Sequence, residues 1–158
     1  MRSFFIDLDV GADKPYDTKD EAQQAIAYLL QETGLPDPAI IDSGGGIHAY
    51  WIFDTDVAYA EWKPYAEKFK RKVMDCIPID PVVTADAARI MRAPDTLNHK
   101  YAPPLPTSVI SNEIPVYEFA DFREFLGAIA PAASALAVLA NVQKGLDEDT
   151  KELLKTGN

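Results

Sequence analysis

SFFIDLDV, residues 3–10, is the stretch that decides the fold, because it combines an apolar run with two acidic side chains. Successive side chains of a β-strand point to opposite faces, so Phe5 and Leu8 lie on different faces whereas Asp7 and Asp9 share one. The pattern therefore predicts a half-buried strand whose two carboxylates project from the same face.

A helix is predicted after this strand. Thr18 and Glu21 have the spacing of a capping box, in which the side chains of the first turn satisfy its unpaired backbone N–H groups. The stretch EAQQAIAYLLQET, residues 21–33, follows them. Gly34 and Pro36 come next, and a glycine followed by a proline is typical of a helix end.

A hairpin is predicted over residues 39–53. AIID, residues 39–42, and IHAYWIF, residues 47–53, have strand-like apolar patterns, and three glycines separate them. The hairpin places His48 near its tip.

The rest of the chain supplies a second helix and two short strands. The helix is expected around residues 57–76, with Pro64 in the first turn of its longer part. TSVIS at 107–111 and PVYEF at 115–119 predict the strands. The order strand, helix, strand, strand, helix and mixed segment indicates the α+β class, with a sheet layered against helices.

Composition sets the class of protein. The chain has 158 residues, of which 47% are hydrophobic, and this suits one globular domain. Its single cysteine, Cys76, excludes an internal disulfide framework, and the N-terminus has no secretory signal pattern, so we expect a cytoplasmic protein. The alanine-rich stretch 125–142 is interrupted by Pro131, and the chain has a mean hydropathy of −0.14, so a packed or partly exposed helix is expected there, not a membrane span.

The charge balance argues against strong binding of nucleic acid by this chain alone. The net charge is −10, whereas proteins that bind duplexes usually carry a basic excess. The positive charge is nevertheless concentrated in two clusters. One consists of Lys63, Lys68, Lys70, Arg71 and Lys72, and the other of Arg89, Arg92 and Lys100.

Three separated segments predict a two-metal site for a nucleoside triphosphate. Asp7 and Asp9 offer carboxylate oxygens, which Mg²⁺ and Mn²⁺ prefer, and Asp80 can complete the set. Phosphoryl and nucleotidyl transfer depend on positioning and on metal ions held about 3.5–4 Å apart. The glycines after Ser43 would let backbone amides approach phosphates, and His48 could donate to a phosphate oxygen.

Each segment also has a simpler interpretation. Paired aspartates at this spacing occur in sugar transferases and in aspartate-based phosphatases, or merely as acids at a strand end. The phosphatase pattern asks for Thr or Val where this chain has Gly11. SGGGIH could be a flexible hairpin with a half-buried histidine, and the basic residues could be a solvated face. The occurrence of all three segments in order favours the nucleotide site.

These segments resemble the motifs of the archaeo-eukaryotic primase superfamily, especially the primase-polymerases of phages and plasmids. Asp7 and Asp9 match its Asp-x-Asp motif, and Gly46-Ile47-His48 its small-x-His motif, with Ser43 just upstream. Ile79-Asp80 matches the third motif, a hydrophobic residue followed by Asp. RIMRAPDTLNHK, residues 89–100, is similar to the basic and hydrophobic segment that follows it. The resemblance covers about residues 3–101.

The resemblance implies an RRM-like mixed β-sheet packed against helices, and it implies a role for each matching residue. The metal-binding and catalytic residues would be Asp7, Asp9 and Asp80, holding two Mg²⁺ or Mn²⁺ ions. The nucleotide-binding residues would be Ser43, Gly46, His48, Arg92, Asn98 and Lys100. Asp86, a rival for the third metal ligand, fits the family's spacing less well than Asp80.

Two positions depart from the family pattern. Gly46 stands where a serine is frequent, and Asp95 stands where the family's Pro-Gly-Thr turn has glycine. The second departure puts the geometry of that turn in question, but not the metal site.

The implied function is that of a template-directed nucleotidyltransferase, a DNA primase or DNA polymerase, cut from a larger replication protein. Residues 1–118 would form the catalytic core, and residues 119–158 a helical extension toward a missing downstream region. The expected partners are nucleoside triphosphates, a single-stranded DNA template and a downstream helicase domain, with no membrane. The expected location is the cytoplasm of a bacterial or archaeal cell, with a phage or plasmid as the source of the gene.

Two other functions stay open from the sequence. A noncatalytic RRM-like nucleic-acid module would have a similar sheet, although such sheets usually carry exposed aromatic side chains and no trio of acids. A metal-dependent phosphohydrolase would use the same metals to activate water.

Overall fold

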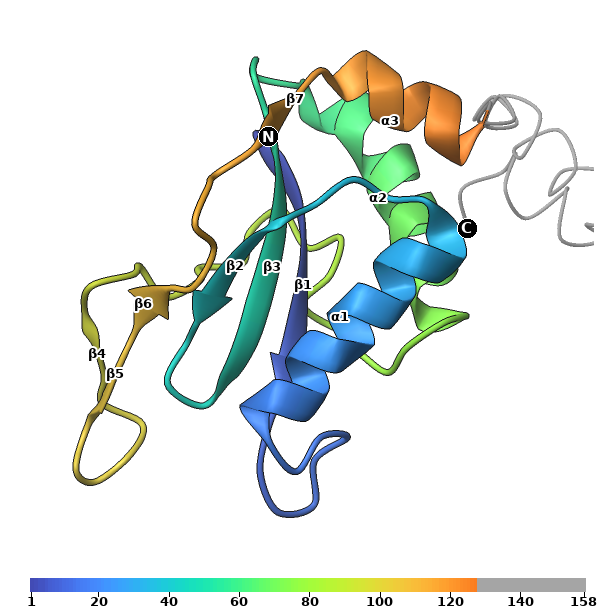
Figure 1. Ribbon diagram of the computed structural model, residues 1–158. Helices are drawn as coiled ribbons and strands as arrows, with labels where there is room; N and C mark the ends of the chain where they lie inside the picture. The colour runs from blue at the N-terminus through green and yellow to red at the C-terminus, as the bar shows by residue number, and fades with distance from the viewer. Residues whose placement is uncertain (128–158) are drawn as a thin grey trace, which may run out of the picture. The chain divides into compact units, whose positions relative to one another are not determined.

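The computed structural model describes residues 1–127, which form a sheet with three helices (Figure 1). Most of the predicted extension 119–158, and most of the stretch 125–142, lie outside the described residues. Within residues 1–127, no helix is long and apolar enough to cross a membrane.

The centre of the sheet is β3 (Gly46–Phe53), which pairs antiparallel with β1 (Ser3–Asp9) on one side and with β2 (Ala39–Asp42) on the other. The predicted hairpin is therefore confirmed. The short strand β6 (Ser108–Val109) extends the sheet beyond β2, in the order β1-β3-β2-β6. β7 (Val116–Tyr117) pairs with the far end of β3 in parallel, which makes the sheet mixed.

α1 (Lys19–Thr33) begins and ends at the predicted residues. The Glu21 N–H donates to Thr18 Oγ1 at 3.2 Å, whereas the Glu21 carboxylate accepts from the Asp17 N–H, one residue before the cap. Gly34 ends the helix in the left-handed conformation that glycine adopts without strain.

α2 (Tyr59–Met74) runs through Pro64 and is joined to the first strand by a hydrogen bond, in which the Trp62 indole donates to the Ser3 carbonyl at 2.9 Å. α3 (Phe119–Leu126) follows β7. A small separate hairpin, β4 (Leu97–Asn98) with β5 (Leu105–Pro106), lies beyond β6 in Figure 1.

The core lies between the sheet and the helices. Phe4 of β1 stacks on Phe69 of α2 with ring centroids 4.9 Å apart, and it meets Phe53 of β3 and Phe122 of α3 edge to face. Helix α3, the part of the predicted extension 119–158 that the structure describes, thus packs in the same core as the first strand. Figure 1 shows the three helices gathered on one side of the sheet.

This arrangement confirms the predicted α+β fold and leaves the other face of the sheet for polar groups. Residues Phe4, Ile6 and Leu8 of β1 are buried toward the helices. Because side chains alternate along a strand, Asp7 and Asp9 project from the opposite face.

The turn at Asp95 keeps a backbone that suits glycine. Asp95 has φ of 59°, in the left-handed region that aspartate tolerates better than most residues. Its N–H donates to the Thr107 carbonyl at 2.9 Å, and the Thr107 hydroxyl donates to the Ala93 carbonyl at 2.8 Å. Aspartate is thus accommodated in a left-handed turn at this position.

Candidate active site

An acid and a histidine face each other across the two central strands. Strand pairing places Asp7 of β1 directly opposite His48 of β3. His48 Nε2 lies 3.6 Å from Asp7 Oδ1, and the histidine side chain is buried. The sheet itself therefore holds the pair in register, because neither residue can slip without moving every pair of β1 and β3.

Burial and nearby acids make Asp7 hard to ionise. The pKa of Asp7 is raised to about 6, first by burial and then by the negative charges of Asp9 and Asp80, while Arg89 and Arg92 act in the opposite direction. Three acids close enough to repel one another form a site that a cation would stabilise.

Asp80 reaches this site from far along the chain. Its backbone N–H donates to the Asp7 carbonyl at 3.0 Å, and its Oδ1 accepts from the Val82 N–H at 2.8 Å. The segment before it is held by Tyr16, whose hydroxyl donates to the Pro78 carbonyl, and by the buried Ile79. The structure thus brings together the three acids that the sequence singled out.

The acids have other partners in this structure. Asp9 Oδ2 forms an ion pair with Lys14 Nζ at 2.8 Å, and Asp80 Oδ1 caps the turn that follows it. Among residues 1–127, no three His, Cys, Asp or Glu side chains are arranged as a ready-made metal site. The donor chemistry suits Mg²⁺ or Mn²⁺, because both prefer carboxylate oxygens and would relieve the repulsion that raises the pKa of Asp7.

The glycine turn between β2 and β3 is tightly packed. A Cβ on Gly46 would collide with the Leu8 carbonyl oxygen of β1, and a Cβ on Gly45 would collide with the Tyr101 hydroxyl. Gly44 has φ of 84°, which favours glycine. Close contacts within the protein thus require these glycines, independently of any contact with a ligand.

Ser43 and Asn98 hold this turn. The Ser43 hydroxyl donates to the Gly46 carbonyl at 3.1 Å, and the Asn98 amide donates to the Ser43 carbonyl at 2.9 Å. Asn98 Oδ1 accepts from the Lys100 N–H at 3.1 Å. Ser43 and Asn98 are both buried, whereas Lys100 is exposed. Direct contact of these residues with a nucleotide stays a prediction, and their contacts here are those of positioning residues.

A cleft of about 530 Å³ opens beside Asp7 and His48. Of the residues predicted to bind nucleotide, His48 and Arg92 line it. Among residues 1–127, the predicted nucleotide-binding residues that do not line it are Ser43, Gly46, Asn98 and Lys100. Its full lining is Asp7, His48, Asp86, Ala88, Arg89, Ile90, Met91 and Arg92. Two exposed guanidinium groups therefore share the cleft with the acid and histidine of the sheet.

Asp86, the rival for the third metal ligand, also faces the cleft. Its Oδ1 accepts from the Ala88 N–H at 3.0 Å and so shapes the loop that forms one wall. Asp80 is the acid whose backbone is bonded to Asp7, whereas Asp86 lies with the arginines.

Tyr50 is a residue of the site that the sequence analysis missed. Its hydroxyl lies 3.2 Å from His48 Nδ1, and burial raises its pKa to about 12. A phenol that donates to Nδ1 leaves the ring proton on Nε2, the nitrogen next to Asp7. Its position two residues after His48, on the same face of β3, could have revealed it.

Burial also keeps His48 neutral. Burial, and then the charge of Arg92, lowers the pKa of His48 to about 4, against the opposing effect of Asp9 and Asp42. At neutral pH the ring is therefore an uncharged donor and acceptor, and its tautomer decides what Nε2 can do.

Tyr50→Phe is expected to weaken the preference of His48 for the Nε2–H tautomer. The lost hydrogen bond is worth about 0.5–1.5 kcal/mol, so the tautomer ratio should fall by about 2–10-fold. Imidazole ¹⁵N chemical shifts at pH 7 measure the ratio directly. Tyr28→Phe, at an exposed tyrosine of α1, serves as the control, and identical His48 spectra in Tyr50→Phe and the unaltered protein would show that the phenol does not orient the ring.

Comparison with known proteins bears on the fold. The sequence matches no protein-family model and no curated protein. The structure is similar to the AEP domain of the primase-polymerase (PrimPol) of cyanophage S-2L, with a TM-score of 0.61 and 19% sequence identity. The similarity covers 80% of this chain but 60% of that domain. The chain thus has the fold of an archaeo-eukaryotic primase catalytic domain.

Proposed function

We propose that this chain is the catalytic core of a primase-polymerase, a nucleotidyltransferase that joins nucleoside triphosphates along a DNA template. The observation that carries the proposal is the pairing of Asp7 with His48 across β1 and β3, beside a cleft that Arg89 and Arg92 also line. Asp7, an acid suited to a metal ion, and two cations suited to phosphates thus line one cleft. Since the chain spans 60% of the similar domain, the activity of a whole protein belongs to the proposal as well.

The residues that would hold two divalent ions are Asp7, Asp9 and Asp80. Their mutual repulsion supports this role, since it raises the pKa of Asp7 and would be relieved by bound cations. Bound Mg²⁺ or Mn²⁺ would supply charge neutralisation and activation of the attacking oxygen. Lys14 would have to release Asp9 for the carboxylate to serve as a ligand.

The cations of the cleft would bind the triphosphate. Arg92 and Arg89 offer several fixed N–H donors each, which suit phosphate oxygens. Neutral His48 would donate from Nε2 to a phosphate oxygen without adding charge. In the reaction, a 3′ hydroxyl oxygen bonds to the α-phosphorus and pyrophosphate leaves, so these side chains would orient the triphosphate and stabilise the leaving pyrophosphate.

The open face of the sheet argues against a noncatalytic RRM-like module. Phe5, on the same face as Asp7, is only 6% exposed, and Tyr50 is half-buried and engaged with His48. Modules that bind nucleic acid through their sheet need exposed aromatic rings on the central strands. Here those positions are covered or used for the site.

Primer extension tests the proposal. The protein is incubated with a primed single-stranded template, Mn²⁺ or Mg²⁺, and labelled nucleoside triphosphates, and products are separated by length. Template-dependent extension, or new oligomers without a primer, is the expected result. Release of phosphate without longer products would replace the proposal with a phosphohydrolase, and no reaction with either metal would refute it.

Arg92→Ala is expected to weaken nucleotide binding by about 1.5–3 kcal/mol, the range for a hydrogen bond to a charged group. Binding of Mn²⁺ alone should change little, because Arg92 is assigned to the phosphates. Calorimetry with Mn²⁺, and then with a nonhydrolysable nucleotide, separates the two. Arg71→Ala, at an exposed arginine of α2 outside the cleft, is the matched control, and loss of Mn²⁺ binding in Arg92→Ala without nucleotide would contradict the assignment.

A further inference from the structure

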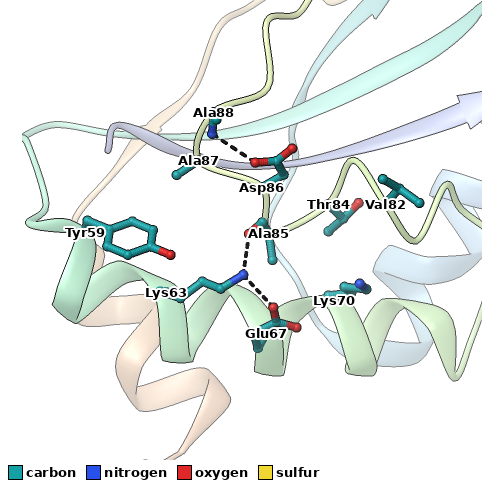
Figure 2. Close-up of a pocket in the computed structure, with 10 residues that line it drawn as sticks. All are labelled: Tyr59, Lys63, Glu67, Lys70, Val82, Thr84, Ala85, Asp86, Ala87 and Ala88. Atoms are coloured by element: carbon teal, nitrogen blue, oxygen red, sulfur yellow. Dashed lines mark hydrogen bonds and ion pairs between the residues drawn. The ribbon is translucent and has the colours of Figure 1, made fainter.

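A second pocket lies between α2 and the loop 82–88 (Figure 2). It has a volume of about 380 Å³. We call it the α2 pocket. Its lining includes Tyr59, Lys63 and Lys70 on the helix, and Thr84, Ala85 and Asp86 on the loop.

Hydrogen bonds of Lys63 hold the wall of this pocket together. Lys63 Nζ donates to Glu67 Oε1 at 2.6 Å and to the Ala85 carbonyl at 2.8 Å, as Figure 2 shows. Ala85 is buried and has φ of 69°, a backbone conformation that costs free energy in a residue with a Cβ. The lysine therefore ties the loop to the helix, and Glu67 neutralises its charge.

Two polar groups of the pocket have no hydrogen-bond partner within residues 1–127. Thr84 is only 2% exposed, and its Oγ1 is the one buried side-chain polar atom of the described residues without a hydrogen bond. Buried hydroxyl groups without partners are unfavourable and call for an explanation. The half-buried Lys70 likewise has no ion pair or hydrogen bond through its ammonium within residues 1–127. In Figure 2 it lies on the same side of the pocket as Thr84.

The α2 pocket adjoins the catalytic cleft, because Asp86 and Ala88 line both. Tyr59, the first residue of α2, lies at one end of the pocket and is 56% exposed. An exposed ring of this kind can stack on a nucleic-acid base. A single ammonium without a hydrogen bond or ion pair matches the single charge of a phosphodiester better than the several charges of a free triphosphate.

We propose that the α2 pocket binds a short run of a DNA single strand that passes beside the catalytic cleft. Lys70 contacts a phosphodiester, and the Thr84 hydroxyl donates to the same phosphate. Tyr59 lies about 16 Å from Lys70 along α2, so it stacks on a base farther along the strand. The course of the strand past the cleft rests on the proposed function. The binding itself requires neither metal nor catalysis.

Fluorescence anisotropy of a labelled 20-nucleotide oligothymidylate, measured with the full chain in EDTA at low salt, tests the proposal. Lys70→Ala should raise the Kd at least 5-fold and reduce the slope of log K against log salt by about 0.7, the value for one phosphate contact on a single strand. Arg71→Ala removes the same charge from the neighbouring position of α2, outside the pocket, and should change the Kd less than 2-fold.

Two further substitutions test the other contacts. Tyr59→Ala should raise the Kd about 5-fold or more, whereas Tyr59→Phe, which keeps the ring, should bind like the unaltered protein. Thr84→Val removes the unpartnered hydroxyl, so it should raise the Tm and also raise the Kd about 3-fold. A higher Tm with an unchanged Kd would remove Thr84 from the site.

Equal effects of Lys70→Ala and Arg71→Ala would overturn the proposal, because they would show only general attraction to the basic helix. A Lys70→Ala variant that loses affinity for thymidine triphosphate and not for the oligonucleotide would overturn it as well. Oligonucleotide binding that depends on Lys70 and Tyr59, together with no primer extension, would refute the proposed function alone. Normal extension by Lys70→Ala at limiting template would refute the pocket alone.

Discussion

Asp7→Asn is expected to abolish nucleotide addition and at the same time to stabilise the metal-free protein. Asp7 is assigned to the metal ions, and asparagine removes one negative ligand. Its pKa is raised from 3.8 to about 6 in the folded protein, so ionised Asp7 opposes folding. At about 1.4 kcal/mol per unit of pKa, and with allowance for its partial exposure, the gain in unfolding free energy should be about 1–3 kcal/mol.

The gain should depend on pH in a defined direction. The folded state holds the Asp7 proton more tightly than the unfolded state, so the unaltered protein loses stability as the pH rises from 3.8 to about 6. The advantage of Asp7→Asn should therefore be complete above pH 6 and vanish below pH 4. Urea denaturation in EDTA at several pH values measures it. Asp54→Asn, at an exposed acid outside the site, is the control.

Asp9→Ala is a second variant to compare with Asp7→Asn in activity and in stability. It should also abolish nucleotide addition, but its metal-free stability should change by only about 0.5 kcal/mol, since it loses an exposed ion pair with Lys14. Primer extension by either variant would show that the chemistry lies elsewhere. Lower stability of Asp7→Asn at pH 7 would contradict the account of burial and repulsion.

Gly46→Ala is the second substitution for which we expect a large effect. The added Cβ would collide with the Leu8 carbonyl oxygen, a backbone atom of the paired strand that cannot rotate away. We expect a loss of about 3 kcal/mol in unfolding free energy, the upper part of the usual cost of overpacking. Because Gly46 pairs with Asp9, the end of β1 should shift, and primer extension should fall by about tenfold or more.

Gly45→Ala is the matched control for this prediction. Its Cβ would meet the hydroxyl end of the Tyr101 side chain, which lies at the surface and can move. Its loss of stability should be less than half that of Gly46→Ala. Equal losses in urea denaturation would show that the close approach of the two strands is not what requires Gly46.

The features that the sequence analysis predicted correctly depend on local patterns. Alternation along SFFIDLDV predicted the strand and the shared face of Asp7 and Asp9, and the structure has both. Thr18 and Gly34 marked the ends of α1, because their effects act within one helical turn. The glycine turn predicted the hairpin, although the collisions that require Gly45 and Gly46 involve distant residues.

By itself, the sequence determined the α+β class and the residues capable of metal and phosphate chemistry. Both depend only on side-chain types and on the local periodicity of apolar residues. Only the tertiary structure decided that the Asp80 backbone bonds to Asp7, that Tyr50 contacts His48 and that Arg92 shares their cleft. It also decided the raised pKa of Asp7 and the lowered pKa of His48. The physical reason is that burial and charge proximity depend on which distant segments pack together, and no local pattern records that packing.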